Sequence, residues 1–199
     1  MNARILPETW WYFLLPLILV IVSCEDFQTK SYSMTEKDSR ACVQLKDTTF
    51  QVTFPARLTN YNPDWRNDQI SQIAGEVIAA LADDSLIVSE NDLAYLMPTG
   101  EGKDTTYILL ESQANSVTLY FDQAVEQNLI AQDGVLLLAA DAVIPLETIG
   151  GCTQLEKDTY IPVIQRRSVY NLSANQYLIQ LIKIDQTAED NIRLSVIAN

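Results

Sequence analysis

The sequence contains no histidine, and this absence argues against several common classes of enzyme. Histidine is the usual general base, the partner of a nucleophilic serine or cysteine, and the most frequent transition-metal ligand. The motifs G-x-S-x-G and G-x-G-x-x-G are also missing, and Gly100-Glu101-Gly102-Lys103 lacks the spacing of a phosphate-binding loop. We therefore expect a protein that is not an enzyme and holds no dissociable cofactor. An enzyme that uses a pair of carboxylates stays an open alternative, because carboxylates also catalyse without histidine.

Basic residues are scarce, because 13 lysines and arginines face 26 aspartates and glutamates, for a net charge of −13. A protein this acidic repels the phosphates of nucleic acids, so we predict no nucleic-acid partner. Asp83, Asp84 and Asp141 could supply oxygen ligands to calcium. No EF-hand spacing is present, however, and we predict no metal site. The basic pair Arg166 and Arg167 is expected to form surface salt bridges from opposite faces of a strand.

The longest uninterrupted apolar run is Trp10 to Val22, which contains 13 residues. A helix needs about 20 apolar residues to span a bilayer, so a run of this length fits the core of a signal peptide better. Arg4 precedes the run, and Ser23 and Cys24 follow it. This order of positive charge, apolar core, small residue and cysteine indicates an exported protein.

The segment Ile21-Val22-Ser23-Cys24 resembles the lipobox of bacterial lipoproteins. The resemblance implies that residues 1–23 are a signal peptide cut after Ser23, and that Cys24 carries a covalent diacylglycerol and acyl chains such as palmitate. It also implies a protein anchored in the bacterial cell envelope and facing the periplasm or the cell exterior. Two alternatives stay open: an ordinary signal peptide cut elsewhere, or an uncut helix over Ile5 to Ser23 that makes the protein a single-span membrane subunit.

Two cysteines, Cys42 and Cys152, remain in the rest of the chain. An even pair in an oxidising compartment predicts a disulfide, and the alternative is two buried free thiols. The bridge would close a loop of about 110 residues and contribute about 4.7 kcal/mol in the chain-entropy model. It would join the start of the domain to the turn at Gly150-Gly151.

Composition divides the chain after residue 23 into three parts. The polar stretch 24–41 is typical of a flexible tether. Residues 42–104 carry strand and helix patterns that would form a subdomain packed on the core. Residues 105–199 contain short β-rich runs separated by turn signals, which predicts a β-sandwich.

Within residues 42–104 we expect one half-buried strand and two helices. Thr48 to Phe54 alternates, with Phe50, Val52 and Phe54 on the buried face. An apolar stripe with helical spacing over 70–81 predicts an amphipathic helix, which Asp83 and Asp84 would end because negative charge disfavours a helix C-terminus. A short second helix is expected from Ser89 and Asp92 through Leu96.

Residues 105–199 show seven strand patterns at roughly ten-residue spacing. Their spacing argues against alternating strand and helix units and favours an antiparallel, jelly-roll-like sandwich. The turn-then-strand stretch 170–181 resembles the late strands of jelly-roll modules in secreted and carbohydrate-binding bacterial proteins. The predicted strands are 106–111, 116–121, 135–140, 160–165, 168–172, 176–184 and 192–197.

Aromatic side chains are the remaining candidate ligand-binding residues, because sugars stack on ring faces. Tyr61 and Trp65, just before the helix at 70–81, are the best placed. Most other tyrosines alternate with aliphatic residues, which is typical of a half-buried core.

These patterns predict a mainly β lipoprotein that acts as a scaffold or accessory subunit of a membrane-associated complex. Its expected partners are the membrane, through the lipid on Cys24, and a protein of the envelope. The alternative in a second class is a module that binds glycan or cell-wall polymer through Tyr61 and Trp65.

Overall fold

The computed structural model describes residues 34–98, 105–143, 152–156, 159–173, 175–183 and 191–199. All of them belong to one compact unit that spans residues 32–199. The segment that resembles a lipobox, Ile21 to Cys24, lies outside the described residues. Among the described helices, none is long and apolar enough to cross a bilayer.

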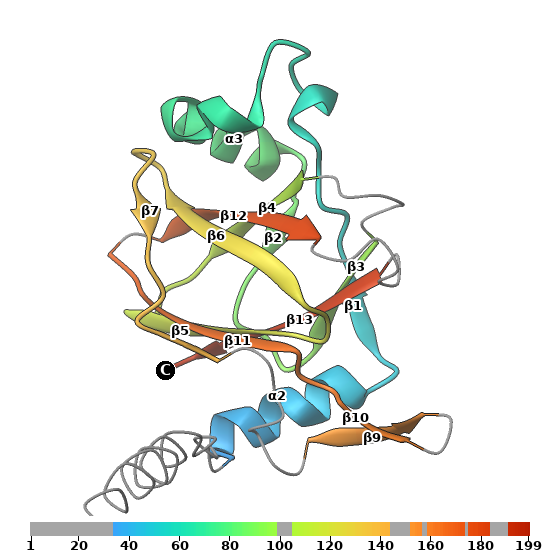
Figure 1. The fold of residues 1–199 in the computed structure, drawn as a ribbon. Coiled ribbons are helices and arrows are strands. Elements are labelled where there is room, and N and C mark those ends of the chain that lie inside the picture. The colour runs from blue at the N-terminus through green and yellow to red at the C-terminus, as the bar shows by residue number, and fades with distance from the viewer. Residues whose placement is uncertain (1–33, 99–104, 144–151, 157–158, 174, 184–190) are drawn as a thin grey trace, which may run out of the picture. The chain divides into compact units, whose positions relative to one another are not determined.

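Two β-sheets pack face to face, as the prediction of a β-sandwich required (Figure 1). Neighbouring strands are antiparallel except β1 with β3 and β2 with β4, so each sheet is mixed where an antiparallel sandwich was expected. The six-stranded sheet has the order β1 (Phe50–Val52), β3 (Ala94–Pro98), β13 (Asn191–Ala198), β5 (Ser116–Phe121), β11 (Arg166–Asn171) and β8 (Asp141–Val143). The five-stranded sheet has the order β2 (Ile87–Val88), β4 (Thr105–Glu111), β12 (Gln176–Lys183), β6 (Val125–Ala131) and β7 (Leu136–Leu137).

Helices cover the outer faces of the two sheets (Figure 1). Helix α2 (Glu36–Lys46) packs on the six-stranded sheet, and α3 (Ile70–Asp83) packs on the five-stranded sheet. The 3₁₀ turns η2 (Leu58–Asn60) and η3 (Asn67–Gln69) lead into α3. The hairpin of β9 (Thr153–Glu156) and β10 (Thr159–Pro162) follows Cys152.

The central strands are buried on both faces, which explains why they are almost continuously apolar. In β12, Tyr177, Ile179 and Leu181 enter the core between the sheets, whereas Leu178 faces α3. In β5, Phe121 enters the same core and Tyr120 lies under α2. Because successive side chains of a strand point to opposite faces, one strand serves two apolar layers.

Helix α3 confirms the amphipathic stripe predicted over 70–81. Its buried residues recur at helical spacing and pack on β4, β6 and β12. The turn between β6 and β7 also lies against this helix, since a Cβ built on Gly134 would fall 1.8 Å from the Ser71 carbonyl oxygen. Gly134 has φ of +84°, which L side chains rarely adopt.

Several predicted boundaries are wrong. The residues expected to form a second helix, Ser89 to Leu96, instead lead into β3, and residues 36–41 of the expected tether form the first half of α2. The predicted boundary at residue 104 does not separate two structural units. Strands β1 and β3, which precede it, join the sheet that contains β13, and β2 pairs with β4 across it. Strand β6 was not predicted, and the run 135–140 contains only the two-residue β7. The other expected strands are confirmed to within two or three residues.

Replacing Gly134 tests the close approach of the β6–β7 turn to α3. We expect Gly134→Ala to lower the free energy of unfolding by about 2–3 kcal/mol, because it adds a clash with backbone to an unfavourable φ. Gly75→Ala is the matched control, since its Cβ would lie 3.3 Å from the Gln132 carbonyl oxygen and alanine favours the helix. Urea unfolding measures both, and equal losses would contradict this packing.

Candidate functional site

A surface pocket of about 560 Å³ lies between the segment after β1 and the C-terminal end of α3. It combines two aromatic side chains, two carboxylates and one amide with small apolar residues. The lining residues are Phe54, Pro55, Ala56, Asn60, Tyr61, Ala80, Asp83, Asp84 and Leu86.

The first wall of the pocket is held by backbone pairing. The Ala56 N–H donates to the Tyr107 carbonyl and the Tyr107 N–H donates to the Ala56 carbonyl, both at 2.8 Å. This bridge ties the chain after β1 to strand β4. Phe54 lies just outside the bridge, and 61% of its surface is exposed.

The second wall is the end of α3, which closes in a Schellman motif. The Leu86 N–H donates to the Leu81 carbonyl at 3.0 Å, and the Ser85 N–H donates to the Ala82 carbonyl at 3.1 Å. Ser85 takes the left-handed conformation that this motif needs, with φ of 57°. The motif fixes Asp83 and Asp84 at the rim of the pocket.

Tyr61 joins the two walls. Its hydroxyl donates to Asp84 Oδ2 at 2.7 Å. Burial and the neighbouring carboxylate of Asp84 raise the pKa of the Tyr61 hydroxyl well above its usual range. The phenol therefore stays neutral at physiological pH and its hydrogen is directed at Asp84.

The pocket has a strongly negative electrostatic character. Both aspartates lie at the negative end of the α3 dipole, and the last turn of this helix contains no basic residue. None of the nine lining residues is a lysine or an arginine. The arrangement can accept hydrogen bonds and attract positive charge, and it repels anions.

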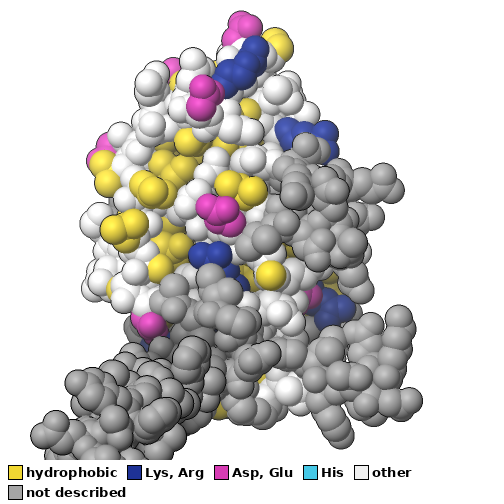
Figure 2. Space-filling model, viewed as in Figure 1, with side chains coloured by type: hydrophobic (Ala, Val, Ile, Leu, Met, Phe, Trp, Pro, Cys, Tyr) yellow, Lys and Arg dark blue, Asp and Glu magenta, His cyan; other side chains and the backbone are white. Residues whose placement is uncertain are grey.

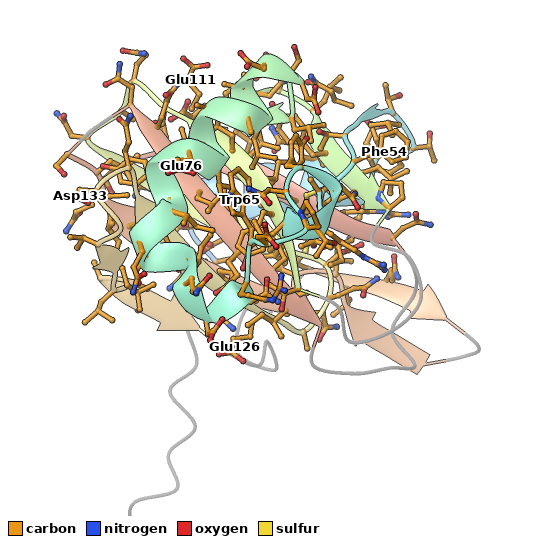
Figure 3. The ribbon with its side chains drawn as sticks, turned by 90° about the horizontal axis from the view of Figure 1, so that it is seen from above. Phe54, Trp65, Glu76, Glu111, Glu126 and Asp133 are labelled. Atoms are coloured by element: carbon orange, nitrogen blue, oxygen red, sulfur yellow. A yellow bond between two sulfur atoms is a disulfide. The ribbon has the colours of Figure 1, made fainter. Side chains whose placement is uncertain are left out.

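Only one of the two candidate ligand residues predicted from the sequence lines the pocket. Tyr61 lines the pocket, whereas Trp65 is partly buried against the apolar cluster under α3 and does not line it (Figure 3). Phe54 was expected in the core, yet Phe54 and Val52 are exposed. Val52 lies in the edge strand β1 and Phe54 follows that strand. Strand alternation predicts which residues share a face, but it does not indicate that a strand lies at an edge where that face stays exposed.

The carboxylates considered for calcium do not meet. Asp83 and Asp84 lie at the pocket, whereas Asp141 is on β8 and contacts Arg167 Nη2 at 2.7 Å. In the part of the chain that the structure describes, no group of three histidine, cysteine, aspartate or glutamate side chains could hold a metal ion.

A second charged cluster is buried between α2 and the six-stranded sheet. Asp38 is completely buried and accepts hydrogen bonds from the Tyr120 hydroxyl at 2.9 Å and from the Thr35 N–H at 2.9 Å. Arg167, 7% exposed, lies 3.3 Å from Asp38 Oδ1 and also pairs with Asp141. Arg166 points to the other face of β11 and donates to the Val125 carbonyl at 2.6 Å. The opposite orientations are as predicted, but Arg167 is buried, not on the surface.

The charged cluster around Asp38 attaches α2 to the six-stranded sheet. Burial by itself would raise the pKa of Asp38, but hydrogen bonds from Thr35 and Tyr120 and the charge of Arg167 outweigh burial and hold it below the usual range. Asp38 is also the third residue of the α2 capping box with Thr35. Because its carboxylate is fully enclosed by protein groups, it is not accessible to a ligand.

Removing Arg167 tests the strength of this contact. We expect Arg167→Met to lower the free energy of unfolding by about 3–5 kcal/mol, because it leaves the buried Asp38 carboxylate without its cation. Arg40→Met is the matched control, since Arg40 pairs with Asp92 at 2.6 Å on the surface, where an ion pair contributes about 1 kcal/mol or less. Similar losses in the two variants would show that the buried pair has no special role.

The same contact predicts how stability changes in acid. A carboxyl with a lowered folded-state pKa stabilises the protein above its unfolded pKa of about 3.9, and this contribution is lost as the pH falls through the lower folded value. We expect the free energy of unfolding to fall more steeply below about pH 4 in the unmodified protein than in Asp38→Asn. Urea unfolding between pH 2 and 6 measures the slopes, and identical slopes would contradict the assignment.

Cys42 and Cys152 form a disulfide, with their Cα atoms 5.8 Å apart, as the pair of cysteines predicted. The bridge joins α2 to the start of the β9–β10 hairpin. Both sulfurs lie in the apolar cluster between α2 and the sheet, and neither residue is more than 6% exposed.

Apolar side chains are exposed at the edge of the five-stranded sheet. Leu136 of the edge strand β7 and its neighbours Val135 and Leu138 are 51%, 57% and 84% exposed. Figure 2 shows hydrophobic side chains gathered on the face that carries β6 and β7. Exposed apolar edges of this kind are typical of surfaces that contact other proteins.

Comparison with known proteins adds no assignment. No protein-family model matches the chain, and no curated protein matches it at a significant level.

The position of the pocket aspartates makes a prediction about stability. A carboxylate at the negative end of a helix is unfavourable, so we expect Asp83→Asn to raise the free energy of unfolding by about 0.5 kcal/mol. Glu76→Gln, an exposed change within the same helix, should alter it less (Figure 3). Thermal unfolding at low ionic strength measures both, and destabilisation by Asp83→Asn would show that this carboxylate supports the fold.

Proposed function

We propose that this protein is a lipid-anchored lipoprotein of the bacterial cell envelope and acts, without catalysis, as an accessory subunit of a membrane-associated complex. The disulfide between Cys42 and Cys152 is the observation that carries the proposal. Disulfides persist in oxidising compartments, which agrees with export directed by residues 1–23. The pairing also leaves Cys24, in the segment that resembles a lipobox, as the cysteine available for acylation.

The distribution of buried and exposed groups in the described domain supports a binding role. The most deeply buried charged group, Asp38, is enclosed by partners and holds α2 in place. Two exposed features of the described residues, the acidic pocket and the apolar edge at β7, suit contact with another molecule. Glycan binding through Tyr61 and Trp65 stays an alternative, although only Tyr61 of the two lines the pocket.

Intact mass of the protein extracted from its native membrane tests the anchor. We expect a mass that begins at Cys24 and includes a diacylglycerol and acyl chains. Cys24→Ser should leave residues 1–23 attached and carry no lipid, while Cys42→Ser should keep the acylated mass.

Two other masses would contradict this proposal. An unmodified mass that includes residues 1–23 would make the protein a single-span membrane subunit. A mass that begins elsewhere and has no acyl chains would make it a secreted protein.

A further inference from the structure

We propose that the pocket between Phe54 and the end of α3 binds a lysine or arginine side chain of a partner protein. This inference rests on the proposed function, because it assumes an accessory subunit that has a protein partner. The pocket would supply the chemistry by which the subunit recognises that partner. It is carried by three features of the pocket: its two carboxylates, its exposed aromatic surface and its lack of any basic residue.

The first feature is the placement of the carboxylates. Asp83 and Asp84 stand at the negative end of α3, where two adjacent negative charges oppose the helix dipole. Among the described residues, Asp84 accepts a hydrogen bond from the neutral Tyr61 hydroxyl, and no salt bridge includes either aspartate. A local arrangement that costs stability is typical of a functional site. A bound ammonium or guanidinium group would relieve this repulsion.

The second feature is the aromatic and apolar lining. Phe54 is 61% exposed beside the carboxylates, and Tyr61 forms part of the same wall. Cations are attracted to the faces of aromatic rings, and the methylene stems of lysine and arginine pack on apolar surface. Pro55 and Leu86 supply such surface within the pocket. The pocket volume of about 560 Å³ is large enough for an extended basic side chain and part of its backbone.

The third feature is charge complementarity. The whole chain has a net charge of −13, so a basic segment would be attracted from a distance at low ionic strength. An anionic ligand would be repelled by both aspartates. A neutral saccharide could stack on Phe54, but it would leave the two carboxylates without a counter-charge.

Binding of three tripeptides to the full-length protein in neutral detergent tests the proposal. The peptides have blocked ends and a central lysine, arginine or glutamine, and amide chemical shifts of residues 54–61 and 80–86 report binding. We expect the lysine and arginine peptides to shift these amides in 20 mM salt and the glutamine peptide to leave them unchanged. Binding should weaken strongly in 1 M salt, because screening shortens the range of the interaction.

Matched variants locate the site. We expect Asp83→Asn/Asp84→Asn to weaken binding about tenfold, since two exposed ion pairs are lost. Asp64→Asn/Glu76→Gln removes the same charge from exposed positions outside the pocket and should change binding by less than about twofold. Phe54→Ser should weaken binding about threefold through the lost cation–ring contact.

Three results would overturn the proposal. These are equal weakening in the two double variants, equal binding of the glutamine peptide, and shifts at the pocket with an N-acetylglucosamine tetrasaccharide but with neither cationic peptide. Intact mass of the same preparation reports the acyl anchor separately, so failure of the pocket proposal and failure of the anchor proposal can be told apart.

Discussion

A buried ion pair between Asp38 and Arg167 fastens α2 to the six-stranded sheet. Asp38 caps its own helix through Thr35 and reaches across to Tyr120 and Arg167 of the sheet. An isolated buried carboxylate would be strongly unfavourable, so each donor around it is needed. The disulfide from Cys42 to Cys152 adds a covalent link to the same helix. Without α2, the apolar outer face of β5 and β13 would be open to water.

Helix α2 and the acidic pocket lie on different sheets of the domain. Helix α2 is the first described element and packs on the six-stranded sheet. The acidic pocket lies against the other sheet, at the end of α3. Helix α2 and the pocket are therefore on opposite sides of the core between the two sheets.

Much of the fold could be predicted because it depends on local patterns. The stripe over α3 and the short β-rich runs of β5, β12 and β13 between turn signals identify these elements from the sequence alone. Helix α2 was missed because its buried positions include Asp38 and Gln44, which polar partners satisfy, so no apolar stripe is visible. Strand β3 was mistaken for a helix because capping signals are local, whereas its pairing with β13 is about 100 residues distant in the chain.

The disulfide, the buried ion pair and the pocket also differ in how far the sequence predicts them. Counting cysteines was enough to predict the disulfide. The partners Asp38 and Arg167 are 129 residues apart, and nothing in the spacing of either residue identifies the other. The pocket brings together Phe54, Tyr61 and Asp84 from three segments. The sequence indicated Tyr61 as a ligand residue and Asp84 as a possible calcium ligand, but it placed Phe54 on the buried face of a strand. Phe54 is exposed just after an edge strand, a position that the sequence does not specify.

The redox state of Cys42 and Cys152 in intact cells tests this account most directly, because the covalent link from α2 to the β9–β10 hairpin is this disulfide and the proposed export predicts an oxidising compartment. Cells would be quenched with acid, treated with a thiol-alkylating reagent before and after reduction, and the protein analysed by mass. The account predicts that neither cysteine is alkylated until the protein is reduced and denatured. Alkylation of both cysteines without reduction would show that the protein resides in a reducing compartment and that α2 is held without a disulfide.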